Sequence, residues 1–204
     1  MKKYVLLSLS FILFFNCQKT DKDILNETIA QLTATTTIEY DVMIESVNKL
    51  YNQTRKDSAT CYFDFSSTDT IIGAKYHFIS NFGEQVFNGK QEFNSQNKEA
   101  LVLYNEHPLK RHVSSSIFMQ NSFFALRNVL PKILKDSTIR IHQTKDTILL
   151  NTDCYTFDIT MNGKFIGLAG ELTKMPEKTT DPIHYELYIS KKNLLPIRFG
   201  NIHP

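Results

Sequence analysis

Apolar and polar residues alternate with a period of two along much of the chain, which predicts β-strands. The pattern is clearest where Ile38, Tyr40, Val42 and Ile44 alternate with mostly charged residues. Successive side chains of a strand point to opposite faces of a sheet, so this alternation predicts a strand with one buried face. Similar alternation predicts further strands over three later segments, namely 61–65, 74–78 and 100–104.

Two Asn-Gly pairs predict tight hairpins, because both central residues of a type I′ turn need positive φ. The first is Asn88-Gly89 and the second is Asn162-Gly163. A two-residue turn at the second pair makes the apolar residues of the flanking strands face one another. In that register three pairs are expected: Met161 with Lys164, Ile159 with Ile166, and Phe157 with Leu168.

A third hairpin is predicted near the end of the sequence. Apolar positions alternate over 185–189 and again over 195–199, with a polar turn at 190–193 between them. Proline has no N–H to donate to a neighbouring strand. Pro196 therefore predicts that the last strand lies at a sheet edge or is bulged there.

One segment, 116–134, has apolar residues at helical rather than strand spacing. The apolar stripe consists of Met119, Phe123, Leu126, Leu130 and Ile133, while Phe124 falls outside it. Pro131 is expected to kink the helix or to start a second helix after Leu130. This segment predicts a helical cover over one face of the sheet, and a gate over an apolar cavity is the alternative.

The first residues have the layout of a secretory signal peptide. Lys2 and Lys3 precede an uncharged, strongly apolar run over 4–15. A membrane-spanning helix needs roughly 20 apolar residues, so this run is too short to be one. Cys17 follows where cleavage is expected, although Phe14 and Asn16 depart from the usual residues of a lipoprotein box. We expect residues 1–16 to be the signal peptide and Cys17 to carry the lipid.

The residues after Cys17 are polar and charged, and we expect a tether over 17–36. Within it, 24–32 forms either a short helix or a loose segment. The length of the remaining sequence suits a single domain, expected over 37–204. Taken together, the elements predict a mainly β (α+β) fold, an antiparallel sheet with a central helical insert.

Charge and motifs exclude several functions. The chain has 23 basic and 21 acidic residues, and it becomes neutral once Lys2 and Lys3 are removed, so nothing favours nucleic-acid binding. No hydrolase, phosphate-binding or metal-binding motif occurs, and the 6 histidines are scattered. Cys61 and Cys154 do not form a Cys-x-x-Cys motif, and we expect both to be free buried thiols. No cofactor, no metal site and no catalytic residue are expected, although an unrecognised enzyme stays a third alternative.

Three segments resemble those of one known group: the alternating strand over 38–44, the segment 71–76, and the closing hairpin over 185–199 with its Leu195-Pro196 step. They resemble the lipoprotein-carrier family (LolA/LolB-like), whose fold is a strongly curved antiparallel half-barrel covered by helices. The chain looks most similar to the N-terminal domain of thioredoxin-containing (TlpA-type) lipoproteins of Bacteroidota. The sequence ends at Pro204 without a Cys-x-x-Cys, so no oxidoreductase activity is implied for it.

The resemblance and the aromatic residues lead to two function hypotheses. The first is a non-catalytic envelope lipoprotein that binds an apolar or acyl-chain ligand or a lipidated partner in a concave sheet. For its anchor, the outer membrane is favoured over the inner. The second is an accessory or docking domain of a thioredoxin-type thiol-disulfide redox lipoprotein whose redox domain is absent from this chain. The candidate cavity residues, which alternatively form an ordinary packed core, are Tyr40, Phe63, Phe65, Phe78, Phe118, Phe123 and Phe157.

Overall fold

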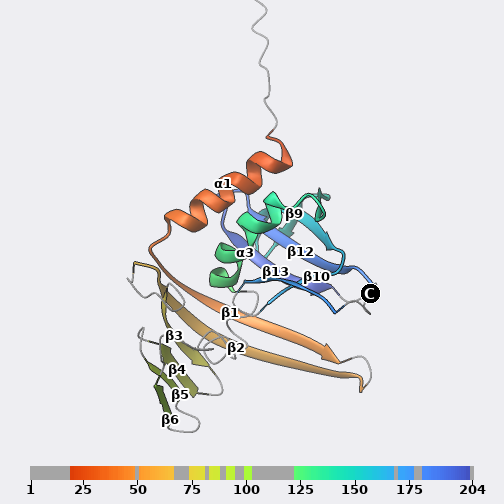
Figure 1. Ribbon diagram of the computed structural model, residues 1–204. Helices are drawn as coiled ribbons and strands as arrows, with labels where there is room; N and C mark the ends of the chain where they lie inside the picture. Colours follow the sequence, from red (N-terminus) through yellow and green to blue (C-terminus); the bar gives the residue numbers. More distant parts are fainter. Residues whose placement is uncertain are drawn as a thin grey trace, which may run out of the picture.

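The computed structural model describes residues 19–48, 51–66, 74–80, 83–87, 91–94, 99–102, 122–167, 170–176 and 181–202. The protein is mainly β, with two helices and curved antiparallel sheets that do not close into a barrel in these residues (Figure 1). This agrees with the fold class expected from the sequence. For residues 83–102 the structure describes the strands alone.

The strands form two main sheets and one small ribbon. The first sheet is a meander in the order β1-β2-β3-β4-β5-β6, and the second has the order β13-β12-β9-β7, with β8 also pairing with β9. Strands β10 and β11 pair with each other. The strands are β1 (Thr37–Asn48), β2 (Gln53–Asp64), β3 (Lys75–Ser80), β4 (Gly83–Phe87), β5 (Gln91–Asn94), β6 (Glu99–Val102), β7 (Arg140–Gln143), β8 (Thr147–Leu149), β9 (Thr152–Met161), β10 (Lys164–Ile166), β11 (Leu172–Lys174), β12 (Ile183–Ser190) and β13 (Pro196–Ile202).

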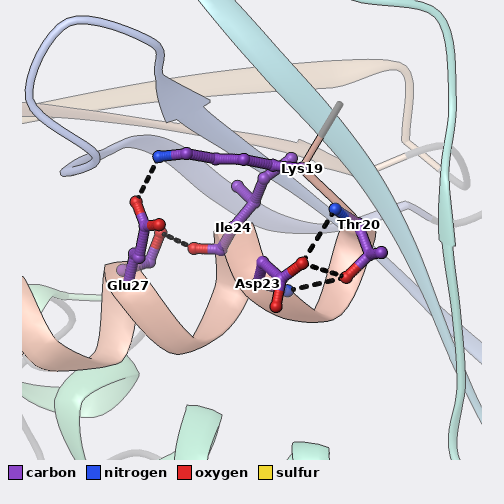
Figure 2. Close-up of polar contacts among 6 residues, drawn as sticks. Lys19, Thr20, Asp23, Ile24 and Glu27 are labelled. Atoms are coloured by element: carbon purple, nitrogen blue, oxygen red, sulfur yellow. Dashed lines mark hydrogen bonds and ion pairs between the residues drawn. The ribbon is translucent and has the colours of Figure 1, made fainter. Parts of the chain in front are cut away.

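Helix α1 (Asp21–Ala34) lies within the segment expected to be a tether. Its start is a capping box, shown in Figure 2: the Thr20 hydroxyl accepts the Asp23 backbone N–H, and the Asp23 carboxylate accepts the Thr20 N–H. This reciprocal pair satisfies donors that the first helical turn leaves without partners. Ile24, Leu25 and Leu32 are at most 1% exposed, so α1 packs into the core. Helix α1 is therefore part of the folded core, although it precedes the expected domain boundary at residue 37.

Helix α3 (Phe123–Lys135) is the described part of the expected helical insert. It begins at Ser122, whose hydroxyl accepts the Ala125 N–H at 3.1 Å. The helix continues through Pro131 and ends at Lys135, so no second helix starts after Leu130. Residues 116–121 of the expected helix lie outside the described residues.

The closing hairpin confirms the prediction from the sequence. Strands β12 and β13 are antiparallel, β13 is at the sheet edge, and the register shifts between Tyr188 and Ile189. Ile189 is paired with Pro196 immediately after that shift. The proline therefore stands at an edge and beside an irregularity, the two places where its missing N–H costs least.

The pairing predicted for Asn162-Gly163 is wrong. Gly163 has φ +62°, as a turn residue requires, but β10 leaves the sheet and pairs with β11 instead of β9. Both edges of β9 are already taken, by β12 over eight residue pairs and by β7. The long apolar strand β12 matches β9 over far more residues than the three of β10. Met161 consequently lies opposite Ile183, rather than opposite Lys164.

The hairpin predicted near Asn88-Gly89 forms, but with a longer connection. Strands β4 and β5 are antiparallel, and Phe87 pairs with Glu92. A two-residue turn would place Phe87 opposite Lys90, so the connection is longer by two residues. The turn itself lies outside the described residues.

The core has two buried clusters that meet at the start of α3. The helix cluster joins α1 and α3 to β9 and β12 of the second sheet. The aromatic cluster lies on the inner face of β1, β2 and β3 and includes Phe124 from α3. Ile38, Tyr40 and Phe65 pack against both clusters. Helix α3 therefore links the two sheets.

Candidate functional site

The inner face of the first sheet presents aromatic side chains in rows across three strands. Tyr40 of β1 is paired with Cys61 of β2, which is paired with Phe78 of β3. The next row consists of Ile38, Phe63 and Tyr76. Side chains that are directly opposite in neighbouring strands lie on the same face, so the strand register alone brings these rings together.

The first turn of α3 lies over this aromatic face. The ring of Phe124 is stacked on that of Phe63, with centroids 5.8 Å apart, and it is also parallel to that of Phe65, at 6.4 Å. The neighbouring Phe123 contacts Phe65 and Tyr40, with centroids 6.2 Å and 6.4 Å away. The Phe123 N–H, left free at the helix start, donates to the Tyr40 hydroxyl at 3.4 Å. The turn therefore covers the face with two adjacent phenylalanine side chains.

Arg127, one turn further along α3, lies over the ring of Phe65 and binds the end of α1. Its guanidinium carbon lies 4.4 Å from the centre of the Phe65 ring. Its Nη1 donates to the carbonyl oxygens of Leu32 and Thr35 at the end of α1, where the helix dipole favours a cation. Helix α1 has no basic residue of its own in its last turn. Partial burial lowers the pKa of the Arg127 guanidinium.

Two titratable groups in the aromatic rows, the Tyr40 phenol and the Cys61 thiol, are held neutral. Burial raises the pKa of the Tyr40 phenol, and burial followed by the charge of Asp41 raises the pKa of the Cys61 thiol to about 12. A nucleophile or general base needs a pKa near the working pH. These two groups are shifted away from it, so the face suits the binding of apolar groups rather than acid–base chemistry.

The two cysteines are free and buried, as expected. Cys61 belongs to the aromatic cluster, whereas Cys154 belongs to β9 in the second sheet. Within the described ranges no three His, Cys, Asp or Glu side chains are grouped to hold a metal ion. Among the described helices, none is long and apolar enough to cross a membrane.

The structure brings together five of the seven aromatic residues proposed as cavity lining. Phe63 and Phe78 are buried in the aromatic cluster, and Tyr40, Phe65 and Phe123 contact it. Phe123 and Phe157 are both members of the helix cluster, and Phe123 reaches the aromatic cluster through Tyr40 and Phe65. Phe118 and the proposed lipid attachment site Cys17 lie outside the described residues.

Two aromatic residues of this site were not among the expected ones. Tyr76 was on a predicted strand face, and its register with Phe63 places it there. Phe124 falls outside the apolar stripe of the helix, so the helical pattern does not predict that it is buried. An aromatic residue beside a stripe signals a second buried face, and here that face is turned to the first sheet.

Comparison with known proteins finds likeness in structure only. No family model matches the chain, and no curated protein matches its sequence. The structure of LprF from Mycobacterium bovis superposes with a TM-score of 0.52 at 9% identity, covering 89% of this chain and 85% of LprF. The lipoprotein LppX from Mycobacterium tuberculosis gives 0.43 at 9% identity, covering 89% and 88%. At this identity the likeness to LprF concerns the fold alone.

The observed fold agrees with the one that the resemblance to the lipoprotein carriers implies. A mainly β structure of curved antiparallel sheets with a helical cover is what that resemblance implies. The closer resemblance to thioredoxin-containing lipoproteins stays a prediction.

Proposed function

We propose that this protein is a non-catalytic lipoprotein of the cell envelope that binds an acyl chain between the inner face of β1–β3 and the first turn of α3. The observation that carries the proposal is that the ring of Phe124, in the first turn of α3, stacks on the rings of Phe63 and Phe65. Apolar ligands bind in concave, aromatic-lined sites with few polar groups. The proposal gives the aromatic cluster that role.

The ligand would take the place of the Phe124 ring. Phe124 is in the first turn of α3, whereas Val129, Leu130 and Ile133 of the later turns hold the helix in the other cluster. Withdrawal of one ring from the first sheet therefore leaves the packing of the later turns intact.

The membrane anchor is the second part of the proposal. The basic residues Lys2 and Lys3, the apolar run after them and the position of Cys17 support export and lipidation. Each buried acyl CH₂ contributes about 0.8 kcal/mol, so two or three acyl chains hold a domain durably at a bilayer. We place the protein at the cell envelope, and at the outer membrane in preference to the inner.

A fluorescent fatty acyl probe tests the ligand site. The purified chain is expected to bind the probe, and Phe63→Ala or Phe123→Ala is expected to weaken binding more than it lowers the free energy of unfolding. Phe157→Ala is the matched control for Phe63→Ala, because both rings are fully buried and Phe157 belongs to the helix cluster instead of the aromatic cluster. It should lower stability without changing the affinity of the folded fraction.

Absence of probe binding by the folded protein would refute the ligand site. The docking domain for a thioredoxin-type envelope protein would then be the better hypothesis. A gene for such a protein adjacent to this one would be independent support for it.

A further inference from the structure

Two aliphatic side chains are exposed to solvent at the tip of the β8–β9 hairpin. Ile148 is 71% exposed and Leu150 is 78% exposed. Leu149 is paired with Thr152, so Leu150 and Asn151 form a two-residue turn, with φ of 50° and 58°. Both central residues thus have the positive φ of a type I′ turn.

Leucine is a poor choice at this position for folding. The left-handed conformation crowds its Cβ, and Asn, Asp or Gly is the usual residue there. Leu150 gains little from packing either, since most of its surface faces solvent. Backbone strain and an exposed apolar side chain at one residue indicate that Leu150 serves contact with another surface instead of the folding of the domain.

The hairpin lies at the same end of the molecule as the start of α1. The Asp21 carboxylate accepts the backbone N–H of Gln143, the last residue before the loop into β8, at 3.1 Å. The turn after β12 is at this end too, because the Lys191 N–H donates to the carbonyl of Asp153 and its ammonium pairs with Asp146. Figure 1 shows the start of α1 on the side of the molecule where β9 is labelled.

This end is also the one nearest to Cys17. The capping box fixes the start of α1 at Thr20, and the Lys19 ammonium is paired with Glu27 (Figure 2). Cys17 lies two positions before Lys19 in the sequence, and a fully extended chain spans at most about 3.6 Å per residue. A lipid on Cys17 would therefore hold this end within several ångströms of a bilayer surface.

We infer that the β8–β9 hairpin tip, with Ile148 and Leu150, is a membrane-contact site that dips into the bilayer to which Cys17 anchors the chain. The inference rests on the proposed lipid anchor. A second attachment point beside the lipid restricts rotation of the domain, and so it fixes which face of the domain is turned toward the bilayer.

The chain contains no tryptophan, so a single introduced indole reports on its own position. The test compares Leu150→Trp with Tyr51→Trp in the full, lipidated chain. Tyr51 is 72% exposed in the turn that joins β1 to β2, and this hairpin points away from α1 in Figure 1. Both variants are reconstituted in vesicles of phosphatidylethanolamine and phosphatidylglycerol with brominated acyl chains.

The indole at position 150 is expected to show a blue-shifted emission that brominated lipid quenches, and the indole at position 51 to show neither. Equal emission at the two positions would overturn the inference. The hairpin would then contact a protein partner, a second copy or solvent instead of the bilayer. Flotation of the same variants with and without Cys17→Ser measures the anchor separately. Flotation that depends on Cys17 without quenching at position 150 refutes the hairpin contact and leaves the anchor standing.

Leu150→Asn gives a second, independent measurement. Asparagine suits the left-handed conformation, so the midpoint of thermal unfolding of the full chain should rise. A lower midpoint would show that Leu150 contributes to folding, and it would overturn the inference.

Discussion

The ring of Phe124 lies flat on the ring of Phe63, with 5.8 Å between centroids and 6° between planes. This contact joins the helical insert to the first sheet, and it is the place where we propose that an acyl chain binds. Phe63 is fully buried and Phe124 is 3% exposed, so a ligand has to displace one ring.

Phe124→Ala is predicted to raise the affinity for a long-chain fatty acyl probe, because the ring no longer competes with it. In a core without a binding site, the same change costs about 3–5 kcal/mol of stability and creates only a small cavity. Titration with the acyl probe and urea unfolding separate the two cases. A stability loss in that range with unchanged probe affinity would contradict the proposal.

Cys17→Ser is predicted to abolish acylation and membrane association. The cysteine thiol is the only group at the expected cleavage position that can carry the lipid. Mass spectrometry of the mature protein and fractionation after a high-salt wash are the measurements. Membrane association of the variant equal to that of the unaltered chain would refute the anchor.

Arg127→Met is predicted to lower the free energy of unfolding by about 1.5–3 kcal/mol, the range for hydrogen bonds made by charged groups. It removes the donor to the carbonyls of Leu32 and Thr35 and keeps most of the apolar stem. Arg140→Met, at an exposed position of β7, is the control and should change stability by less than about 0.5 kcal/mol. Equal effects of the two changes in urea unfolding would show that Arg127 does not join α1 to α3.

Asp136 is predicted to make the protein sensitive to acid. Its hydrogen bond from Lys164, followed by those from Thr138, lowers the pKa of the Asp136 carboxyl from 3.8 to about 2. A lowered folded-state pKa stabilises the protein above the unfolded-state value, and this stabilisation is lost as pH falls through the folded-state pKa. The urea midpoint should therefore fall more steeply between about pH 4 and pH 2 in the unaltered protein than in Asp136→Asn. Parallel pH profiles would contradict this role.

Cys61 and Cys154 are predicted to resist alkylation in the folded protein. Burial raises the pKa of both thiols, that of Cys61 to about 12, so at about pH 8 both thiols stay protonated and unreactive. Mass spectrometry after iodoacetamide treatment should show modification of both only in urea. A folded mass lower by two hydrogens would instead reveal a disulfide.

The period-two alternation was sufficient to predict where several strands run and which of their faces is buried. Strand β1 spans the predicted segment, and Cys61 and Phe63 are both buried on one face of β2. The position of Pro196 predicted either an edge or a bulge, and the last hairpin has both an edge strand and a register shift. These features depend on neighbouring residues only, because side-chain direction in a strand repeats every two residues.

The alternation did not predict which strands pair with one another. The Asn162-Gly163 turn is present, yet β9 pairs with β12, more than twenty residues further along the chain. Alternation states which face is apolar and says nothing about which strand lies alongside. The outcome depends on competition between distant segments for the same edge, and the longest matching apolar strand forms the most cross-strand pairs.

In the candidate site, too, local pattern predicted strand faces, whereas contacts between distant segments required the tertiary structure. The sequence by itself determined that Tyr40, Phe63, Phe65 and Phe78 share apolar strand faces. Only the tertiary structure decided that Phe124 joins them, that Phe157 does not, and that α1 belongs to the core. A helical stripe describes one buried face, whereas α3 lies between two sheets and buries a second face that its local pattern does not reveal.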